Sequence, residues 1–291
     1  MNTDKHRCST VGNTIRLICV HLCLSVVPFP LVGCGGGGGV SKEFKPQAQE
    51  VQKFDNKDWA MVLKTVVTPD GFVKHDMIKN NQGGVRDALF RYVGLIGEVS
   101  PENKPELFAT DKDKLAYYIN AYNALCMYAV YKRDYPPNLA KTVPPYAVYF
   151  FDKFPVGGKE TNLDTIEKEH VRSVGDPRVH FALNCMSHSC PMLRAEPYEG
   201  SKLDEQLNDQ GKKYLSDPRG AQKGDNGTVK LSEIFAKFYT AEWIAAYEKK
   251  TGKTGATLID AIKIYAAPDS PVNGATKYEA MTYDWSLNKP S

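Results

Sequence analysis

The sequence predicts an α+β fold, a mostly helical single domain with a small antiparallel or mixed sheet. Several segments between residues 58 and 266 carry apolar residues at helical spacing, whereas only short runs have strand character. Strands and helices do not alternate along the chain, which argues against a parallel doubly wound sheet. With 291 residues, 42% of them hydrophobic, the chain can bury the core of such a domain without outside help.

Residues 1–33 are predicted to be a lipoprotein signal peptide. Basic residues precede an apolar stretch, residues 17–31, which is short for a membrane-spanning helix and is interrupted by prolines. The stretch ends in LVGC, residues 31–34, which resembles a bacterial lipobox, so Cys34 is expected to carry lipid. The alternative is an ordinary signal peptide whose cleavage site contains a cysteine.

Residues 34–56 are predicted to be a lipidated cysteine followed by a tether, and residues 57–291 the folded domain. The glycine run 35–39 gives the backbone too much freedom for one shape, and about 20 residues of such coil reach about 25 Å. Gly35, in place of the aspartate linked to inner-membrane retention, favours the outer membrane. We therefore expect a cell-envelope protein that is anchored to the membrane by lipid on Cys34.

The charge pattern argues against a nucleic-acid partner. The chain has 37 basic and 34 acidic residues, and they are scattered rather than gathered into a patch. A protein or envelope-polymer partner stays open, because nothing in the composition selects one.

Helices are predicted by spacing and by their end signals. The longest, residues 111–133, opens with acidic and closes with basic residues before Pro136 and Pro137, as the helix dipole favours. Asn120 and Asn123 lie one turn apart on this mostly apolar helix, so we expect them to be buried, where amides either pin a loop or orient a functional group. The other predicted helices are 58–67, the second half of 76–99, 163–172, 202–215, 232–250 and 256–266.

Strands are predicted only as short runs, at residues 146–156, 179–184, 227–230 and 281–288. Gly157 and Gly158 mark a turn after the first. A helix over 179–184 stays open, because a short apolar run does not distinguish the two. Tyr283 and Trp285 of the last run are expected to dock onto the core.

The most chemically dense stretch is HFALNCMSHSCP, residues 180–191. If the leader is removed and Cys34 is lipidated, Cys126, Cys185 and Cys190 remain, and Cys126 sits in an apolar run as a buried small residue. An oxidising compartment permits a disulfide between Cys185 and Cys190. The spacing H-x4-C-x2-H-x-C matches no usual zinc pattern, so neither a metal nor another cofactor is expected.

Several motifs in a fixed order resemble a known family. INAYNAL, LDTIE, DPRVHFALNCMSHSCPMLR, KLDEQL, LSEIF and YDWSLN are similar to segments of the domain of unknown function 547 (DUF547), over about residues 60–288. Met186 departs from the family in standing where a small residue is usual, as does Lys168, where a histidine is common. The family's activity is uncharacterised. The resemblance marks as site positions Asn120, Asn123, Glu167, Arg178, His180, Asn184, Cys185, Cys190 and Pro191.

Two classes of function stay open, and the sequence alone does not decide whether the protein is an enzyme. The first is a binding or assembly module, to which Asn123, Arg178 and Asn184 would contribute. The second is a thiol-dependent hydrolase or transferase with Cys185 as nucleophile, its pKa lowered by a helix starting after it. His180 or His170 would be the base, oriented by Glu167 or Asn120. No histidine follows His188, so a papain-like order is excluded.

Overall fold

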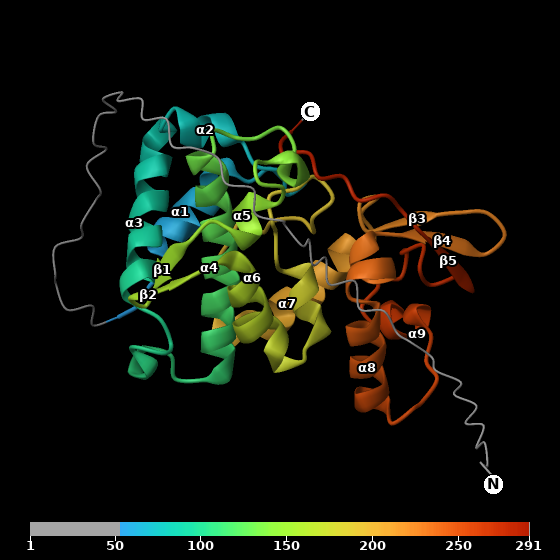
Figure 1. Ribbon diagram of the computed structural model, residues 1–291. Helices are drawn as coiled ribbons and strands as arrows, with labels where there is room; N and C mark the ends of the chain where they lie inside the picture. The colour runs from blue at the N-terminus through green and yellow to red at the C-terminus, as the bar shows by residue number, and fades with distance from the viewer. Residues whose placement is uncertain (1–52, 291) are drawn as a thin grey trace, which may run out of the picture. The chain divides into compact units, whose positions relative to one another are not determined.

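The computed structural model describes residues 53–290. These residues belong to the unit Glu43–Ser291. The predicted signal peptide, Cys34 and most of the predicted tether lie outside the described residues. Figure 1 shows the described part as a group of long helices next to a smaller group that contains three short strands.

The mostly helical α+β class is confirmed. The principal helices are α1 (Lys57–Val66), α2 (His75–Lys79), α3 (Val85–Glu98), α4 (Asp111–Lys132), α5 (Ala147–Phe150), α6 (Leu163–Thr165), α7 (Leu203–Tyr214), α8 (Thr240–Thr251) and α9 (Leu258–Lys263). Shorter helical turns include η4 (Ile166–Val171), η6 (Pro177–Phe181) and η8 (Ile234–Phe238). The strands are β1 (Phe154–Val156), β2 (Lys159–Thr161), β3 (Ala221–Lys223), β4 (Thr228–Leu231) and β5 (Lys277–Ala280).

The first hydrophobic core forms around α4. Thr110 and Asp113 make a reciprocal capping box at its start, which satisfies backbone N–H groups that the first turn leaves free. Most side chains of α4 are buried, because α3, η4 and the residues before α7 pack on different sides of it. This burial explains why the helix is apolar on most sides.

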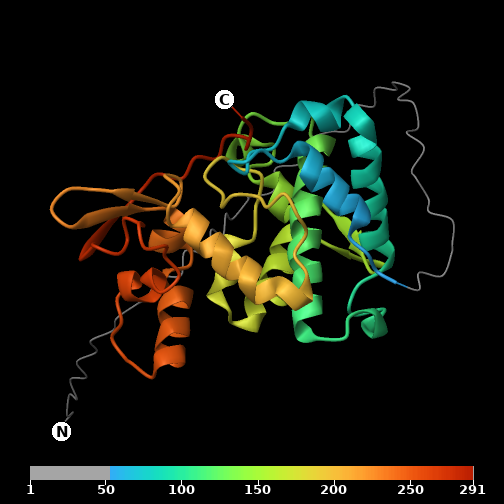
Figure 2. The ribbon, with the colours of Figure 1, turned by 180° about the vertical axis from the view of Figure 1, so that it is seen from behind.

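The second core lies between the small sheet and the C-terminal helices. Its strand order is β3-β4-β5, antiparallel between β3 and β4 and parallel between β4 and β5, so the sheet is mixed. Trp243 of α8 and Phe235 of η8 are fully buried here, against Phe181 of η6. Figure 2 shows α7 crossing between the two groups of helices.

Three predicted strands differ from the structure. Residues 177–181 form the helical turn η6 instead of a strand over 179–184, because Asp176 caps the turn by accepting the Arg178 N–H and Pro177 fits its first position. Residues 147–150 are helical, and only 154–156 of the predicted first strand pair, with β2 across the Gly157-Gly158 turn. Residues 281–288 make isolated bridges only, whereas the strand lies earlier, at β5.

The C-terminal strap, residues 283–288, runs from β5 back to the first core (Figure 1). Its backbone bonds two loops at once: the Leu139 N–H donates to the Trp285 carbonyl, and the His188 N–H donates to the Ser286 carbonyl. The Asn288 N–H in turn donates to the Met186 carbonyl. The strap therefore brings residues from the end of the chain to the loop that carries the cysteines.

Within residues 53–290, none of the helices is both long enough and apolar enough to span a membrane.

Candidate functional site

The thiol loop, residues 184–191, is held in place by two buried amides. Asn123 of α4 donates from Nδ2 to the Ala182 carbonyl (2.9 Å) and accepts the Asn184 N–H at Oδ1 (2.8 Å). Asn184 donates to the Pro191 carbonyl (2.7 Å) and accepts the Met186 N–H (2.9 Å). Because each buried amide is paired at both ends, removing either one would leave polar groups without partners. The loop shape is thus tied to α4.

Met186 occupies a backbone conformation that favours glycine. Its φ is +65°, in the left-handed region, although its side chain is fully buried. Non-glycine residues are uncommon there, and such strain often accompanies functional sites. The conformation turns the chain directly after Cys185, which explains why a small residue would suit this position.

Two thiols and two hydroxyls form the thiol cluster: Cys185, Cys190, Ser187 and Tyr283. The Cys185 sulfur lies 2.9 Å from the Cys190 sulfur and 3.1 Å from Ser187 Oγ. The Tyr283 hydroxyl, from the strap, is 2.9 Å from Ser187 Oγ and 3.3 Å from the Cys190 sulfur. Both cysteines are free thiols, so the predicted Cys185 to Cys190 disulfide is not formed in this structure.

The surroundings shift the pKa values of the two thiols in opposite directions. Burial would raise the pKa of Cys185, but hydrogen bonds from Cys190, Ser187 and Tyr149 outweigh it and lower this pKa to about 6. Burial and the neighbouring Cys185 raise the pKa of Cys190. The surroundings thus favour the thiolate form at Cys185 and the thiol form at Cys190. No helix starts directly after Cys185. Hydroxyl groups and the second thiol, rather than the expected helix N-terminus, therefore lower its pKa.

Tyrosines surround the thiol cluster on the first-core side. Tyr149 of α5 donates its hydroxyl to the Cys185 carbonyl (2.9 Å). Tyr122 of α4 donates to Glu167 (3.1 Å), and burial and the charges of Glu167 and Cys185 raise the pKa of Tyr122. Glu167 therefore lies close enough for its charge to act on the same tyrosine as the Cys185 thiolate, although it does not contact the sulfur.

His180 belongs to a separate ionic clamp, which also includes Glu167, Arg172, Tyr239 and Glu242. The His180 Nε2 is 2.9 Å from Glu242, and its ring stacks on Tyr239 at 3.8 Å. Arg172 forms an ion pair with the same Glu242 carboxylate, and its guanidinium lies over the Tyr239 ring. The Tyr239 hydroxyl donates to Glu167 (2.6 Å). The clamp joins η4 and η6 to η8 and α8, and thus connects the two cores.

Neither histidine predicted as a base contacts the nucleophile. His170 lies 3.2 Å from Glu102 and stacks on Tyr118, and His180 is engaged by the clamp. Among residues 53–290, no imidazole hydrogen-bonds the Cys185 sulfur. The expected group of cysteine, histidine and Glu167 therefore does not assemble.

Two other candidates hold loops rather than facing the thiols. Asn120 bonds both the N–H and the carbonyl of Tyr198 with its amide (2.9 and 2.8 Å). Arg178 pairs with Asp176 and with Asp204 of α7. In each case the polar atoms are used to fix the chain between η6 and α7.

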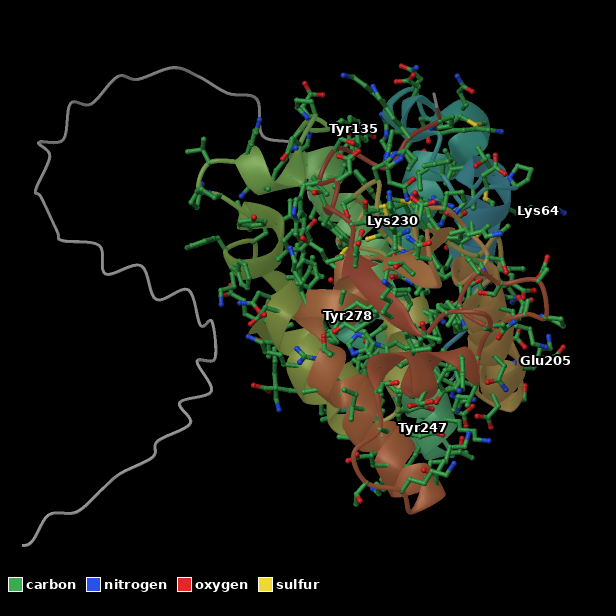
Figure 3. All side chains as sticks on the ribbon, turned by 90° about the vertical axis from the view of Figure 1, so that its right-hand side faces the viewer. Lys64, Tyr135, Glu205, Lys230, Tyr247 and Tyr278 are labelled. Atoms are coloured by element: carbon green, nitrogen blue, oxygen red, sulfur yellow. The ribbon has the colours of Figure 1, made fainter. Side chains whose placement is uncertain are left out.

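A polar groove of about 590 Å³ is lined in part by Tyr283, whose hydroxyl contacts the Cys190 sulfur. Lys230 and Glu279 stand in register on β4 and β5, and Figure 3 shows Lys230 on this sheet. The lining includes His188, Ser189, Arg219, Lys230, Glu279 and Tyr283. Within the described part of the chain, no three His, Cys, Asp or Glu residues are grouped so as to hold a metal ion.

Several site residues had no individual signal in the sequence. Tyr149, Tyr239 and Glu242 are ordinary aromatic and acidic residues, and only their contacts reveal them. Tyr283 was expected to dock, and the YDWSLN motif marked its segment, but its approach to Cys190 spans 93 positions of the chain.

Residues 107–215 match the family model described as "Protein of unknown function, DUF547". This segment contains α4, η4, η6, the thiol loop and α7, so the match supports the domain family that the motifs resemble. Tyr239, Glu242 and Tyr283 lie beyond the matched residues. Comparisons with curated proteins and with solved structures gave no match.

Proposed function

We propose that this domain performs thiol–disulfide exchange, with Cys185 as the attacking thiolate and Cys190 as the resolving thiol. The observation that carries the proposal is the pairing of unlike thiols: their sulfurs are 2.9 Å apart, and the pKa of one is lowered while that of the other is raised. Exchange requires a thiolate whose pKa lies near ambient pH and a second thiol within reach. The thiol cluster meets both requirements.

The steps balance without a cofactor. The Cys185 thiolate attacks one sulfur of a substrate disulfide, so the substrate S–S bond breaks and the other half leaves as a thiolate. That thiolate takes the proton of Cys190. The Cys190 thiolate then attacks the Cys185 sulfur and forms the intramolecular disulfide, while the second substrate half leaves as a thiolate and is protonated by solvent. Two electrons pass from the protein dithiol to the substrate, and a thiol reductant in excess regenerates the dithiol.

Exchange fits this site better than hydrolysis. A thiol hydrolase needs a group that protonates the leaving group and activates water, which is usually an imidazole beside the sulfur. Here the groups at the sulfur are Ser187, Cys190, Tyr149 and Tyr283. These groups stabilise a thiolate but do not act as a base near neutral pH, because burial raises the pKa values of Cys190 and Tyr283.

The test is capture of the intermediate with Cys190→Ser protein. The variant keeps the Cys185 nucleophile but lacks the resolving thiol, so we expect a stable mixed disulfide with a small disulfide such as cystamine. The wild-type protein should instead end as the intramolecular disulfide, with both cystamine halves released. Intact-mass analysis distinguishes the two products. Cys185→Ser protein is the control and should give neither; no adduct on Cys190→Ser protein would contradict the proposal.

A second candidate function is binding without covalent chemistry. The polar groove beside Tyr283 offers charges of both signs, which is typical of a recognition surface. If this domain is a binding or assembly module, an envelope partner captured by the wild-type protein should be captured equally by Cys185→Ser protein. A loss of capture specific to Cys185→Ser would instead favour the thiol function.

We also propose that the domain is held at the cell envelope, at the outer membrane, by lipid on Cys34. The support is the signal-like sequence of residues 1–33 and the LVGC stretch that ends in Cys34. Labelling with a clickable fatty acid tests it: the full chain should be labelled and fractionate with outer membranes. Cys34→Ala protein should lose both properties. Equal labelling of the two proteins would refute the anchor.

A further inference from the structure

Aromatic side chains from three elements pack on Tyr149 and Tyr283, the two tyrosines near Cys185. Trp285 of the strap contacts Tyr283 (4.6 Å between ring centroids) and Tyr149 (6.3 Å), the two tyrosines at Cys185. Phe238 of η8 contacts Tyr283 (5.5 Å) and Trp285 (6.4 Å). Phe150 of α5 lies 6.5 Å from Tyr149. We refer to Phe150, Phe238 and Trp285 as the aromatic rim.

Two members of the rim are exposed to solvent, whereas Trp285 and Cys185 are each partly buried. Phe150 is 48% and Phe238 43% exposed, and Cys185 is intermediate in exposure. Large aromatic side chains that stay exposed in a group are typical of interaction surfaces. The rim is connected to Cys185 through Tyr149 and Tyr283, because it packs on both tyrosines and each of them contacts Cys185.

The immediate surroundings of the sulfur are uncharged. In the described chain the groups that hydrogen-bond it are Ser187, Cys190, Tyr149 and Tyr283, and none carries a charge at neutral pH. An anionic disulfide such as glutathione disulfide finds no compensating cation among these groups. Apolar groups next to a substrate sulfur, in contrast, can be buried against the rim.

We infer that the aromatic rim selects polypeptide disulfides whose cysteines are flanked by apolar side chains. The inference rests on the proposed exchange function, because the thiolate at the centre of the rim requires an electrophilic sulfur in the partner. Phe150 and Phe238 would cover the flanking apolar side chains, and Tyr149 and Tyr283 would border the attacked sulfur. Exposed stretches of this kind occur in incompletely folded proteins, where apolar residues are not yet buried.

The test compares two disulfide-linked peptide dimers that differ only in the residues flanking the cysteine, Phe and Leu in one and Ser and Gly in the other. Single-turnover rates with reduced wild-type protein are divided by the rates of the same peptides with a free small thiol, which removes differences in intrinsic reactivity. We expect the wild-type protein to prefer the apolar peptide by about 10-fold.

The chain offers a matched control for the rim. Phe238→Ser should lower the preference to about 2-fold, whereas Ile264→Ser, at a residue equally exposed (43%) outside the rim, should leave it unchanged. The pH midpoint of Cys185 alkylation should be the same in both variants, which shows that the thiol cluster is intact.

The outcomes separate the two proposals. Equal normalised rates for the two peptides, or an unchanged preference in Phe238→Ser protein, overturn the rim inference and leave the exchange function standing. Absence of exchange with both peptides and with cystamine overturns both.

Discussion

The thiol cluster and the ionic clamp use opposite means to hold polar groups inside the protein. In the clamp, each charge faces a partner: Glu242 contacts Arg172 and His180, and both of these side chains pack on the Tyr239 ring. In the thiol cluster, a single negative charge on Cys185 is held by uncharged donors. Fully paired charges favour one fixed arrangement, whereas a thiolate held by hydroxyl and thiol groups stays available to react.

The comparison shows that residue type alone does not identify chemistry. Histidine and glutamate are the usual acid and base residues, yet here His180 and Glu242 connect two cores. Serine and tyrosine, which are often structural, surround the reactive sulfur instead. The two regions therefore predict opposite mutational effects: changes in the clamp should lower stability, and changes in the thiol cluster should alter reactivity.

The largest expected effect is loss of stability in the clamp. His180→Ala should lower the free energy of unfolding by about 2–3 kcal/mol, because a 3% exposed ring stacked on Tyr239 is removed and Glu242 loses a partner. Urea unfolding measures the change. The alkylation rate of native Cys185 at pH 7 should stay within about 2-fold of wild type. A fall beyond about 10-fold would mean that His180 serves the sulfur.

Replacing Asn123, which joins α4 to the thiol loop, should change both the stability of the protein and the reactivity of Cys185. Asn123→Ala should lower the free energy of unfolding by about 2 kcal/mol, because the Asn184 N–H and the Ala182 carbonyl lose their buried partner. It should also raise the pH midpoint of Cys185 alkylation, since the loop that positions the donors loosens. Urea unfolding and the pH dependence of Cys185 alkylation measure the two changes. A stability loss with an unchanged midpoint would show that the loop keeps its shape without α4.

Removing one hydroxyl from the thiol cluster should affect reactivity more than stability. Tyr283→Phe deletes the hydroxyl that contacts Ser187 and Cys190, so Ser187 is held less firmly at the Cys185 sulfur and the pH midpoint of Cys185 alkylation should rise by less than about 1. The unfolding free energy should fall by about 1 kcal/mol or less. Trp285→Phe, in the same strap but without a contact to the sulfurs, is the control. An equal rise in both variants would assign the effect to the strap rather than to the hydroxyl.

The smallest expected effect is on the stability of the protein at low pH, through Glu242. Burial would raise the pKa of Glu242, but His180 and Arg172 outweigh it and lower this pKa to about 2. A carboxylate with a lowered pKa stabilises the fold fully above the pKa of the unfolded chain, about 4.3, and this contribution is lost as pH falls toward about 2. Glu242→Gln protein should therefore lose less stability than wild type between pH 5 and 2, as followed by thermal unfolding. Parallel loss in the two proteins would argue against this contribution.

Local patterns predicted the helices better than the contacts between distant segments. The 111–133 helix and the burial of Asn120 and Asn123 depend on nearby residues, and the structure agrees with both. The strand predicted at 179–184 is wrong because one capping aspartate and a proline decide that turn. Tyr283 and Glu242 reach their partners across 96 and 62 positions, and no spacing rule contains those distances.

The inequivalence of the two thiols is tested most directly by the pH dependence of Cys185 alkylation in fully reduced, native protein, resolved by peptide mass analysis. We predict a midpoint near pH 6, with Cys190 unreactive over the same range because burial and Cys185 raise its pKa. The thiol cluster as described would be contradicted by a Cys185 midpoint near 8.5, the ordinary value for a cysteine, or by equal reactivity of the two cysteines.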